Sequence, residues 1–123
     1  MAKWSDPEVL DQVRDFYRQL PDDVADAFDA AVELLTEQGP ALGRPVVGEV
    51  ATHEYPKAIR DRLPHLKELR FGSVRVLFTF GPDRVPVLLV AGDKAGTWKA
   101  WYRDAIKEAA REYGRYLEDM ELG

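Results

Sequence analysis

Basic and aromatic side chains suited to an anionic ligand are concentrated between positions 65 and 102 of this 123-residue chain. Lysine and arginine neutralise phosphate groups, and the guanidinium of arginine binds two phosphate oxygens at once. Tryptophan and tyrosine offer flat rings on which a nucleobase can stack, a contact of roughly 1–3 kcal/mol per base. The segment therefore indicates a site for a phosphate-bearing ligand, with the candidates Lys67, Arg70, Arg75, Lys94, Trp98, Lys99 and Tyr102.

The distribution of charge is consistent with this location. A net charge of −5 by itself argues against a nucleic-acid-binding protein, because phosphate neutralisation needs lysine and arginine. However, residues 1–40 hold 3 basic and 10 acidic residues, residues 44–103 hold 11 and 6, and residues 104–123 hold 3 and 6. A basic middle between acidic ends is typical of a protein with one local anionic ligand, and also of ordinary solvated surfaces.

Length and composition predict one domain, residues 1–123, with enough apolar residues for a core. The chain has no cysteine, which excludes disulfides and thiolate metal sites. Its two histidines, His53 and His65, lie apart in the sequence, so no zinc site is expected. The N-terminus lacks a signal-peptide pattern and no apolar run approaches about 18 residues, so we expect a soluble cytoplasmic protein without a membrane partner.

Two helices are predicted in the first 40 residues. The first should be capped near positions 5–7 and end at Pro21, and the second should run from Asp22 or Asp23 to Gly39. Apolar residues recur every three or four positions in both. The acidic residues of their outer faces are interpreted as solvated surface, and they include Asp11, Asp15, Asp26, Asp29 and Glu33.

Three strands and a last helix should follow a loop at 39–64 that contains one short strand at 46–51. Strands at 66–71 and 74–80 flank Gly72-Ser73, a two-residue hairpin turn, and a third apolar strand covers 85–92. Alternation along the second strand places Arg75 on the face opposite Val74 and Val76. Thr97 can cap the last helix.

This order of elements predicts an α+β fold. An N-terminal helical hairpin should pack on a small antiparallel sheet, with a C-terminal helix after the last strand.

The segments that carry a family likeness are 39–45, Leu66 to Arg70, Val74 to Phe78, Leu88 to Lys94, and Trp98 with Trp101-Tyr102. Their order resembles the RelE/HigB family of bacterial toxins within the RelE/ParE superfamily, best its phage-derived, HigB-like branch. The resemblance implies the toxin of a type II toxin–antitoxin system, a ribosome-dependent endoribonuclease or mRNA interferase. In such an enzyme the ribose 2′-hydroxyl attacks the adjacent phosphate, and no metal or other cofactor takes part.

The resemblance also implies roles for single residues. Arg75 matches an arginine that stabilises the phosphate, Lys94 matches a basic turn, and Tyr102 matches a tyrosine that orients or protonates the leaving group. Arg70 and Lys67 complete the expected catalytic set, although Arg70 could equally pair with Glu68 or Asp93. The expected RNA-binding residues are Trp98, Lys99 and His53, whereas Trp101 is better explained as a core residue.

Two departures from the family pattern leave questions open. Many relatives carry a lysine two residues before the position of Arg70, whereas this chain has Glu68 there, with Lys67 on the opposite face of the strand. The identity of the general base is therefore open. The family usually has a strand before the helices, and residues 1–5 leave room for only a very short one, or none.

The expected partners are the ribosome with its mRNA and a HigA-like helix-turn-helix antitoxin, which alone would contact operator DNA. One basic face, with Lys67, Arg70 and Lys94 on it, should meet the RNA while the acidic helices face away. Two alternatives remain. ParE-like members act on DNA gyrase and generally lack the basic and aromatic cluster, and a catalytically silent module would only bind the antitoxin.

Overall fold

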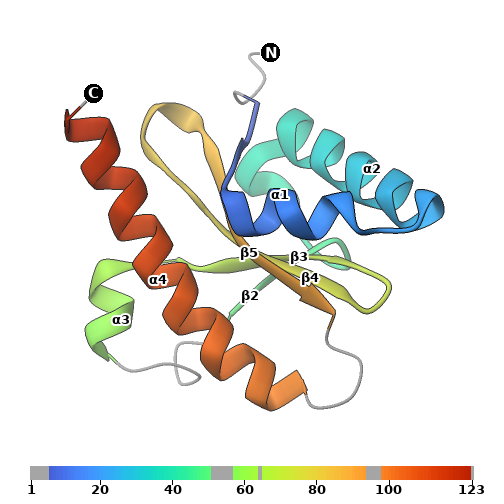
Figure 1. Cartoon of the computed structure of the whole chain (residues 1–123). Helices are drawn as coiled ribbons and strands as arrows, with labels where there is room; N and C mark the ends of the chain where they lie inside the picture. The colour runs from blue at the N-terminus through green and yellow to red at the C-terminus, as the bar shows by residue number, and fades with distance from the viewer. Residues whose placement is uncertain (1–5, 51–56, 64, 94–97, 123) are drawn as a thin grey trace.

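The computed structural model describes residues 6–50, 57–63, 65–93 and 98–122. Helices α2, α4 and strands β3, β4 and β5 confirm the predicted order of elements. In chain order (Figure 1) the elements are β1 (Glu8–Val9), α1 (Asp11–Arg18), α2 (Asp22–Gln38), a 3-10 turn (Gly39–Ala41), β2 (Val47–Glu49), α3 (Lys57–Arg62), β3 (Lys67–Phe71), β4 (Val74–Phe80), a second 3-10 turn (Pro82–Arg84), β5 (Pro86–Asp93) and α4 (Trp98–Leu122).

The strands form one sheet in the order β1-β5-β4-β3-β2, so β4 lies in the middle. Neighbouring strands are antiparallel except β1, which runs parallel to β5. Helices α1 and α2 cover one face of the sheet, and α3 and α4 cover the other (Figure 1). The α+β class is confirmed, while the expectation of a purely antiparallel sheet is wrong at β1.

The pleat of the central strands divides the apolar side chains between two cores. Val74, Val76 and Phe78 of β4 pack with α1 and α2, whereas Leu77 packs with α3 and α4. Arg75 follows the same alternation and lies on the face opposite Val74 and Val76, as predicted, but α3 and α4 cover this face and Arg75 is buried there, which was not predicted. The face of the sheet under α4 therefore carries both a core and a buried charge.

The start of the chain differs from the prediction. Residues Glu8–Val9 form β1, and α1 begins at Asp11, later than the predicted cap. The N–H of Leu10 donates to the carbonyl of Leu88 at 3.1 Å, so this segment completes the edge of β5. Such a tertiary hydrogen bond leaves no trace in local periodicity. The chain thus has a very short strand before its helices, at residues 8–9 rather than at residues 1–5, which lie outside the described residues.

The region predicted as a loop also contains a helix. The strand expected at 46–51 is confirmed as β2, but α3 at Lys57–Arg62 was not predicted. Only Ile59 of this six-residue helix is buried, so it has too few apolar positions for a periodic signal. Packing of Ile59 and Leu63 against the core of α4 stabilises α3 instead.

Helix α4 is the longest element, with 25 residues. One side of it packs on the sheet through Ala105, Ile106 and Ala109, and the other side is charged. Among the helices in the described ranges, none combines the length and the low charge that a membrane span requires.

Beyond β1, a side chain takes over the hydrogen bonding of the β5 edge. The Ala91 N–H donates to Oε1 of Gln12 at 2.8 Å, and Nε2 of Gln12 donates to the Ala91 carbonyl at 2.9 Å. The amide of Gln12 thus makes the two hydrogen bonds that a neighbouring strand would make. Because open sheet edges pair with other chains, α1 protects this edge through one residue.

We expect Gln12→Ala to lower the free energy of unfolding by about 1–3 kcal/mol, because the two polar groups of Ala91 lose their partner. Urea denaturation followed by circular dichroism measures the change. Gln19→Ala is the matched control, since Gln19 is exposed at the end of α1 and no hydrogen bond of its side chain is found in the described part. Equal stability of the two variants would contradict the role of Gln12.

Candidate functional site

The β3–β4 hairpin brings two of the predicted cations together. Arg70 and Arg75 are direct cross-strand partners, and Glu68 lies two residues before Arg70 on the same face. That face is the one under α4, because the partner of Glu68 is Leu77, which packs with α4. Like charges placed opposite each other on adjacent strands repel. The pair therefore needs an anion nearby.

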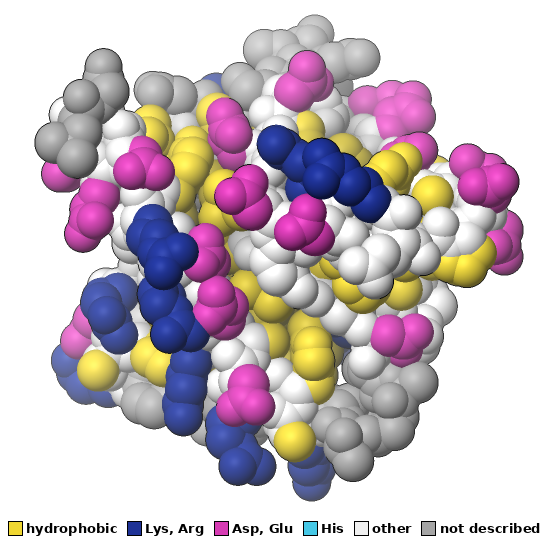
Figure 2. All heavy atoms as spheres, viewed as in Figure 1, with side chains coloured by type: hydrophobic (Ala, Val, Ile, Leu, Met, Phe, Trp, Pro, Cys, Tyr) yellow, Lys and Arg dark blue, Asp and Glu magenta, His cyan; other side chains and the backbone are white. Residues whose placement is uncertain are grey.

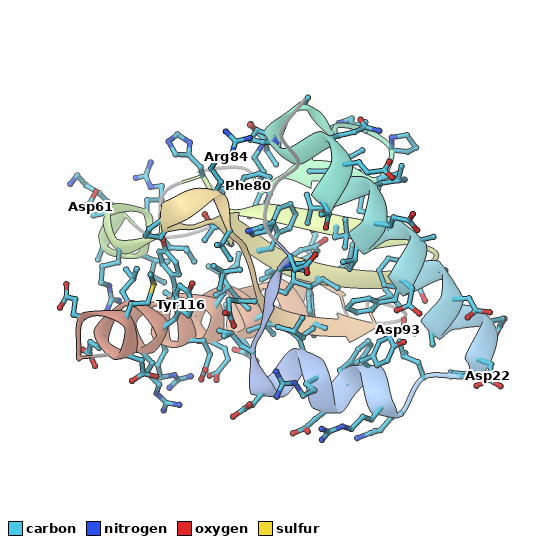
Figure 3. The ribbon with its side chains drawn as sticks, turned by 90° about the horizontal axis from the view of Figure 1, so that it is seen from above. Asp22, Asp61, Phe80, Arg84, Asp93 and Tyr116 are labelled. Carbon is cyan, nitrogen blue, oxygen red and sulfur yellow. The ribbon has the colours of Figure 1, made fainter. Side chains whose placement is uncertain are left out.

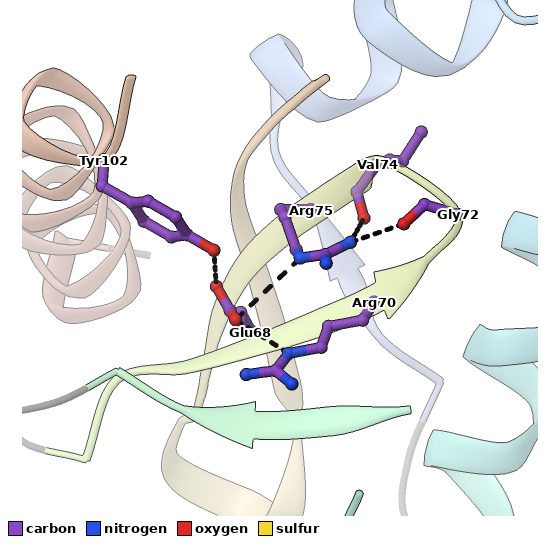
Figure 4. Close-up of polar contacts among 6 residues, drawn as sticks. All are labelled: Glu68, Arg70, Gly72, Val74, Arg75 and Tyr102. Atoms are coloured by element: carbon purple, nitrogen blue, oxygen red, sulfur yellow. Dashed lines mark hydrogen bonds and ion pairs between the residues drawn. The ribbon is translucent and has the colours of Figure 1, made fainter. Parts of the chain in front are cut away.

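Glu68 supplies this anion and is 5% exposed (Figure 4). Its Oε1 accepts a hydrogen bond from Nε of Arg70 at 2.8 Å and lies 4.0 Å from Nε of Arg75. Its Oε2 accepts a hydrogen bond from the hydroxyl of Tyr102 on α4. One buried carboxylate thus joins both arginines of the sheet to the helix above them. We call these four residues the Glu68 cluster.

The guanidinium of Arg75 is held by its own hairpin. Nη1 donates to the carbonyl of Gly72 and to the carbonyl of Val74, both at 2.8 Å (Figure 4). Its Nε is buried without a hydrogen-bond partner and faces Oε1 of Glu68 at 4.0 Å. Arg75 is therefore rigid and nearly enclosed, whereas the side chain of Arg70 remains 28% exposed.

Two glycines make room for the large side chains around the cluster. Gly48 of β2 pairs with Glu68, and Gly92 of β5 pairs with Arg75. A Cβ atom on Gly48 would lie 2.7 Å from Cζ of Arg70, and one on Gly92 would lie 2.6 Å from Cε2 of Trp101. The guanidinium and the indole thus lie directly on backbone, where any other residue would displace them.

Tyr102 is held in its protonated form. Burial raises the pKa of its hydroxyl, and the hydrogen bond to Glu68 and the charge of that carboxylate raise this pKa further. The charge of Arg75 acts in the opposite direction without outweighing these effects. At neutral pH Tyr102 is therefore a hydrogen-bond donor, and it could supply a proton to a stronger base.

The other predicted site residues are distributed differently. Lys67 lies on the opposite face of β3 from Glu68 and Arg70, and its Nζ is 3.6 Å from Oε1 of Glu49. The expectation that Lys67 and Arg70 share one basic face is therefore wrong, because three positions along a strand reverse the side. Lys99 is exposed on α4. Lys94 and His53 lie outside the described residues.

The aromatic residues of α4 also differ in position. Trp98 begins the helix, and its side chain lies outside the described part of the chain. Trp101 is partly buried against the core, which confirms its interpretation as a packing residue. Its ring meets the ring of Tyr102 edge to face, with centroids 5.0 Å apart. Trp101 thus supports Tyr102 from the side.

The sequence held a signal for Glu68 that the prediction did not use. A two-residue turn at Gly72-Ser73 fixes Arg70 opposite Arg75, and alternation then places Glu68 beside them. Glu68 was noted as a departure from a family pattern and as an alternative partner of Arg70, and the structure confirms this pairing. Gly48 and Gly92 gave no such signal, because the side chains that cover them come from distant parts of the chain.

A metal site is not formed by the described residues, since no three His, Asp or Glu side chains among them lie close enough to hold an ion. The chemistry that the cluster itself can offer is that of a carboxylate, two guanidinium groups and a phenol. These groups can accept a proton, bind an oxyanion and donate a proton.

Comparison with known proteins identifies relatives. Residues 15–114 match the family described as phage derived protein Gp49-like (DUF891). "Putative toxin HigB2" of Mycobacterium tuberculosis is 42% identical over 97 residues, which cover 75% of this chain and 44% of the relative. "Putative toxin HigB3" of the same organism is 38% identical over 111 residues, which cover 89% and 90%. No solved structure is a significant match.

Replacement of Glu68 by glutamine should lower the pKa of Tyr102, because the phenolate would no longer face a carboxylate while both arginines remain. Burial persists, so the pKa should stay above its ordinary value. The ultraviolet titration curve of Glu68→Gln minus that of Glu68→Gln/Tyr102→Phe gives the titration of Tyr102 alone, separate from the other tyrosines. If the pKa of Tyr102 is unchanged, its hydrogen bond to Glu68 does not exist in solution.

A second pair of variants tests the space beside Arg75. Gly92→Ala should destabilise the fold by about 1–3 kcal/mol, because the indole of Trp101 must move off the sheet. Gly114→Ala in α4 meets no atom within 4 Å and should stabilise the helix by up to about 1 kcal/mol. Urea unfolding gives both values. A neutral Gly92→Ala variant would show that Trp101 does not pack as described.

Proposed function

Since this chain belongs to the Gp49-like family of phage-derived proteins, we propose that it is the toxin of a toxin–antitoxin system and that it acts by cleaving mRNA on the ribosome. The toxin assignment is supported by two relatives that carry the HigB name, one of which matches over almost its full length. The enzymatic assignment is supported by the Glu68 cluster.

The single observation that carries the proposal is the convergence of a carboxylate, two guanidinium groups and a phenol on one face. Attack of a ribose 2′-hydroxyl on the next phosphate needs a base, cations for the pentavalent phosphorus and a proton donor for the 5′-oxygen. The cluster contains one candidate for each role. Arg70 is its most exposed cation and would meet the phosphate first.

In the proposed reaction, Glu68 accepts the 2′-hydroxyl proton while the 2′-oxygen forms its bond to phosphorus. Arg70 and Arg75 stabilise the negative charge of the phosphorane. The bond from phosphorus to the 5′-oxygen then breaks, and Tyr102 donates its proton to that oxygen, which leaves a 2′,3′-cyclic phosphate. The proton on Glu68 can return to Tyr102 along the hydrogen bond that already joins them.

Other residues have roles in this proposal outside the Glu68 cluster. Lys94 adds a further cation after β5, while Trp98, Lys99 and His53 contact the RNA. Lys67 faces the other side of the sheet and is better assigned to the ion pair with Glu49. The partner that neutralises the toxin is a helix-turn-helix antitoxin, which also binds the operator DNA.

A second function is favoured by the burial of the same cluster. Glu68 is 5% exposed and Arg75 is bonded to its own hairpin, so the four residues are also suited to a purely structural role, in which they hold α4 on the sheet. The chain would then be a catalytically silent module that binds the antitoxin. Cleavage of mRNA distinguishes the two functions.

Arg70→Gln and Tyr102→Phe should each reduce mRNA cleavage by roughly 10²–10³-fold, the usual loss when one group that stabilises a transition state is removed. Expression in a bacterial host, followed by mapping of new mRNA 5′ ends at ribosome positions, measures cleavage. Arg18→Gln is the control, because Arg18 is exposed on α1, where it pairs with Asp15 and lies outside the Glu68 cluster. The enzymatic proposal is excluded if cells that express the wild-type protein show no new mRNA 5′ ends, or if both variants cleave mRNA as fully as the wild-type protein.

A further inference from the structure

The helices differ strongly in their balance of charge. Helix α2 carries six acidic and no basic residues, whereas α3 carries three basic residues and one acidic residue. Viewed from above, Asp22 at the start of α2 and Asp61 of α3 lie at opposite sides of the molecule (Figure 3). The acidic helix α2 and the basic helix α3 therefore lie on different sides of the molecule, a separation that the net charge of −5 conceals.

Helix α4, on the same side of the sheet as α3, carries five basic and six acidic residues, and its cations recur at every fourth position. The five residues are all exposed, and they are Lys99, Arg103, Lys107, Arg111 and Arg115. A step of four residues advances about 6 Å along a helix and about 40° around it. The cations therefore form a slowly winding row, and Figure 2 shows a column of Lys and Arg side chains along α4.

Ion pairs divide this row into two parts. Arg111 is bonded to Glu108, and Arg115 lies 3.2 Å from Glu112, so both have acidic partners one turn away. In the part of the chain that the structure describes, Lys99, Arg103 and Lys107 have no acidic partner within ion-pair distance. We call these three residues the α4 cation stripe.

The α4 cation stripe begins beside the Glu68 cluster. Arg103 follows Tyr102, whose hydroxyl is bonded to Glu68, and Lys99 lies one turn before Arg103. The remaining member, Lys107, lies one turn farther from the cluster. A phosphate held near Arg70 would thus have a line of unpaired cations leading away from it, at a spacing similar to that of consecutive phosphates on an RNA strand.

We propose that the α4 cation stripe binds the sugar-phosphate backbone of the RNA and guides the strand away from the Glu68 cluster. This inference rests on the proposed function and adds the path of the substrate. An RNA backbone fits better than an acidic protein segment, because regularly spaced cations match a regularly spaced polyanion. The acidic helix α2, on the other side of the sheet, faces away from such a strand.

The test measures binding without cleavage. The purified full chain is titrated with a fluorescent, fully 2′-O-methylated single-stranded RNA, which lacks the attacking hydroxyl, at several salt concentrations. Each phosphate contact contributes about 0.7 to the slope of log affinity against log salt on single strands. The triple variant Lys99→Gln/Arg103→Gln/Lys107→Gln should therefore reduce the slope by about 2 and the affinity by roughly tenfold or more.

The matched control removes three positive charges that are already paired, as Arg18→Gln/Arg111→Gln/Arg115→Gln. Its net charge equals that of the stripe variant, so long-range attraction changes equally, but the slope should stay close to that of the wild type. Thermal unfolding confirms that both variants are folded. Equal losses in the two triples, or no loss in the stripe variant, would overturn the proposal.

Two further outcomes separate this inference from the proposed function. If the stripe variant binds RNA normally and loses antitoxin binding instead, the stripe is a protein-docking surface and the inference is wrong. If binding follows the stripe while the wild type never cleaves mRNA, the inference stands and the enzymatic proposal fails. Arg70→Gln, which should strongly reduce cleavage, should retain the stripe-dependent part of the salt slope.

Discussion

The ion pairing of Glu68 is the interaction on which this side of the molecule depends. Hairpin geometry places Arg70 opposite Arg75 on the face of the sheet under α4, where Arg75 is buried and Arg70 is partly exposed. Breaking a buried ion pair by removing one partner typically costs about 3–5 kcal/mol, because the remaining charge stays unpaired. Glu68 therefore makes the pairing of the two arginines possible, and through Tyr102 it also fixes the start of α4 on the sheet.

The cluster could be predicted from the sequence only in part. Alternation predicted that Arg75 would lie opposite Val74 and Val76, and the Gly72-Ser73 turn was predicted correctly, so the relation of the two arginines followed from local rules. The same alternation excludes Lys67 from that face, yet the charge balance of residues 44–103 had suggested one basic face that includes both Lys67 and Arg70. Counting charges along a segment was less reliable here than the pleat of the strand itself.

The elements that the sequence did not reveal are those whose stability comes from distant contacts. Strand β1 exists because β5 has an open edge, and α3 exists because Ile59 and Leu63 pack under α4. Neither segment is long enough to show a period of its own. The need for glycine at positions 48 and 92 also depends on distant contacts, because the side chains that cover these glycines come from other parts of the chain.

The charged residues on this side of the protein fall into two groups: the buried charges of the Glu68 cluster and the exposed cations of the helices. Inside the Glu68 cluster, two arginines and one carboxylate leave an excess of a single positive charge, and burial hides most of it from solvent. Attraction at long range must then come from exposed cations, and α4 and α3 supply them outside the cluster. Surface charges are screened over about 10 Å, so an RNA strand approaching this side interacts little with the acids of α2. A negatively charged protein can in this way present a locally basic surface, with the groups suited to chemistry beneath it.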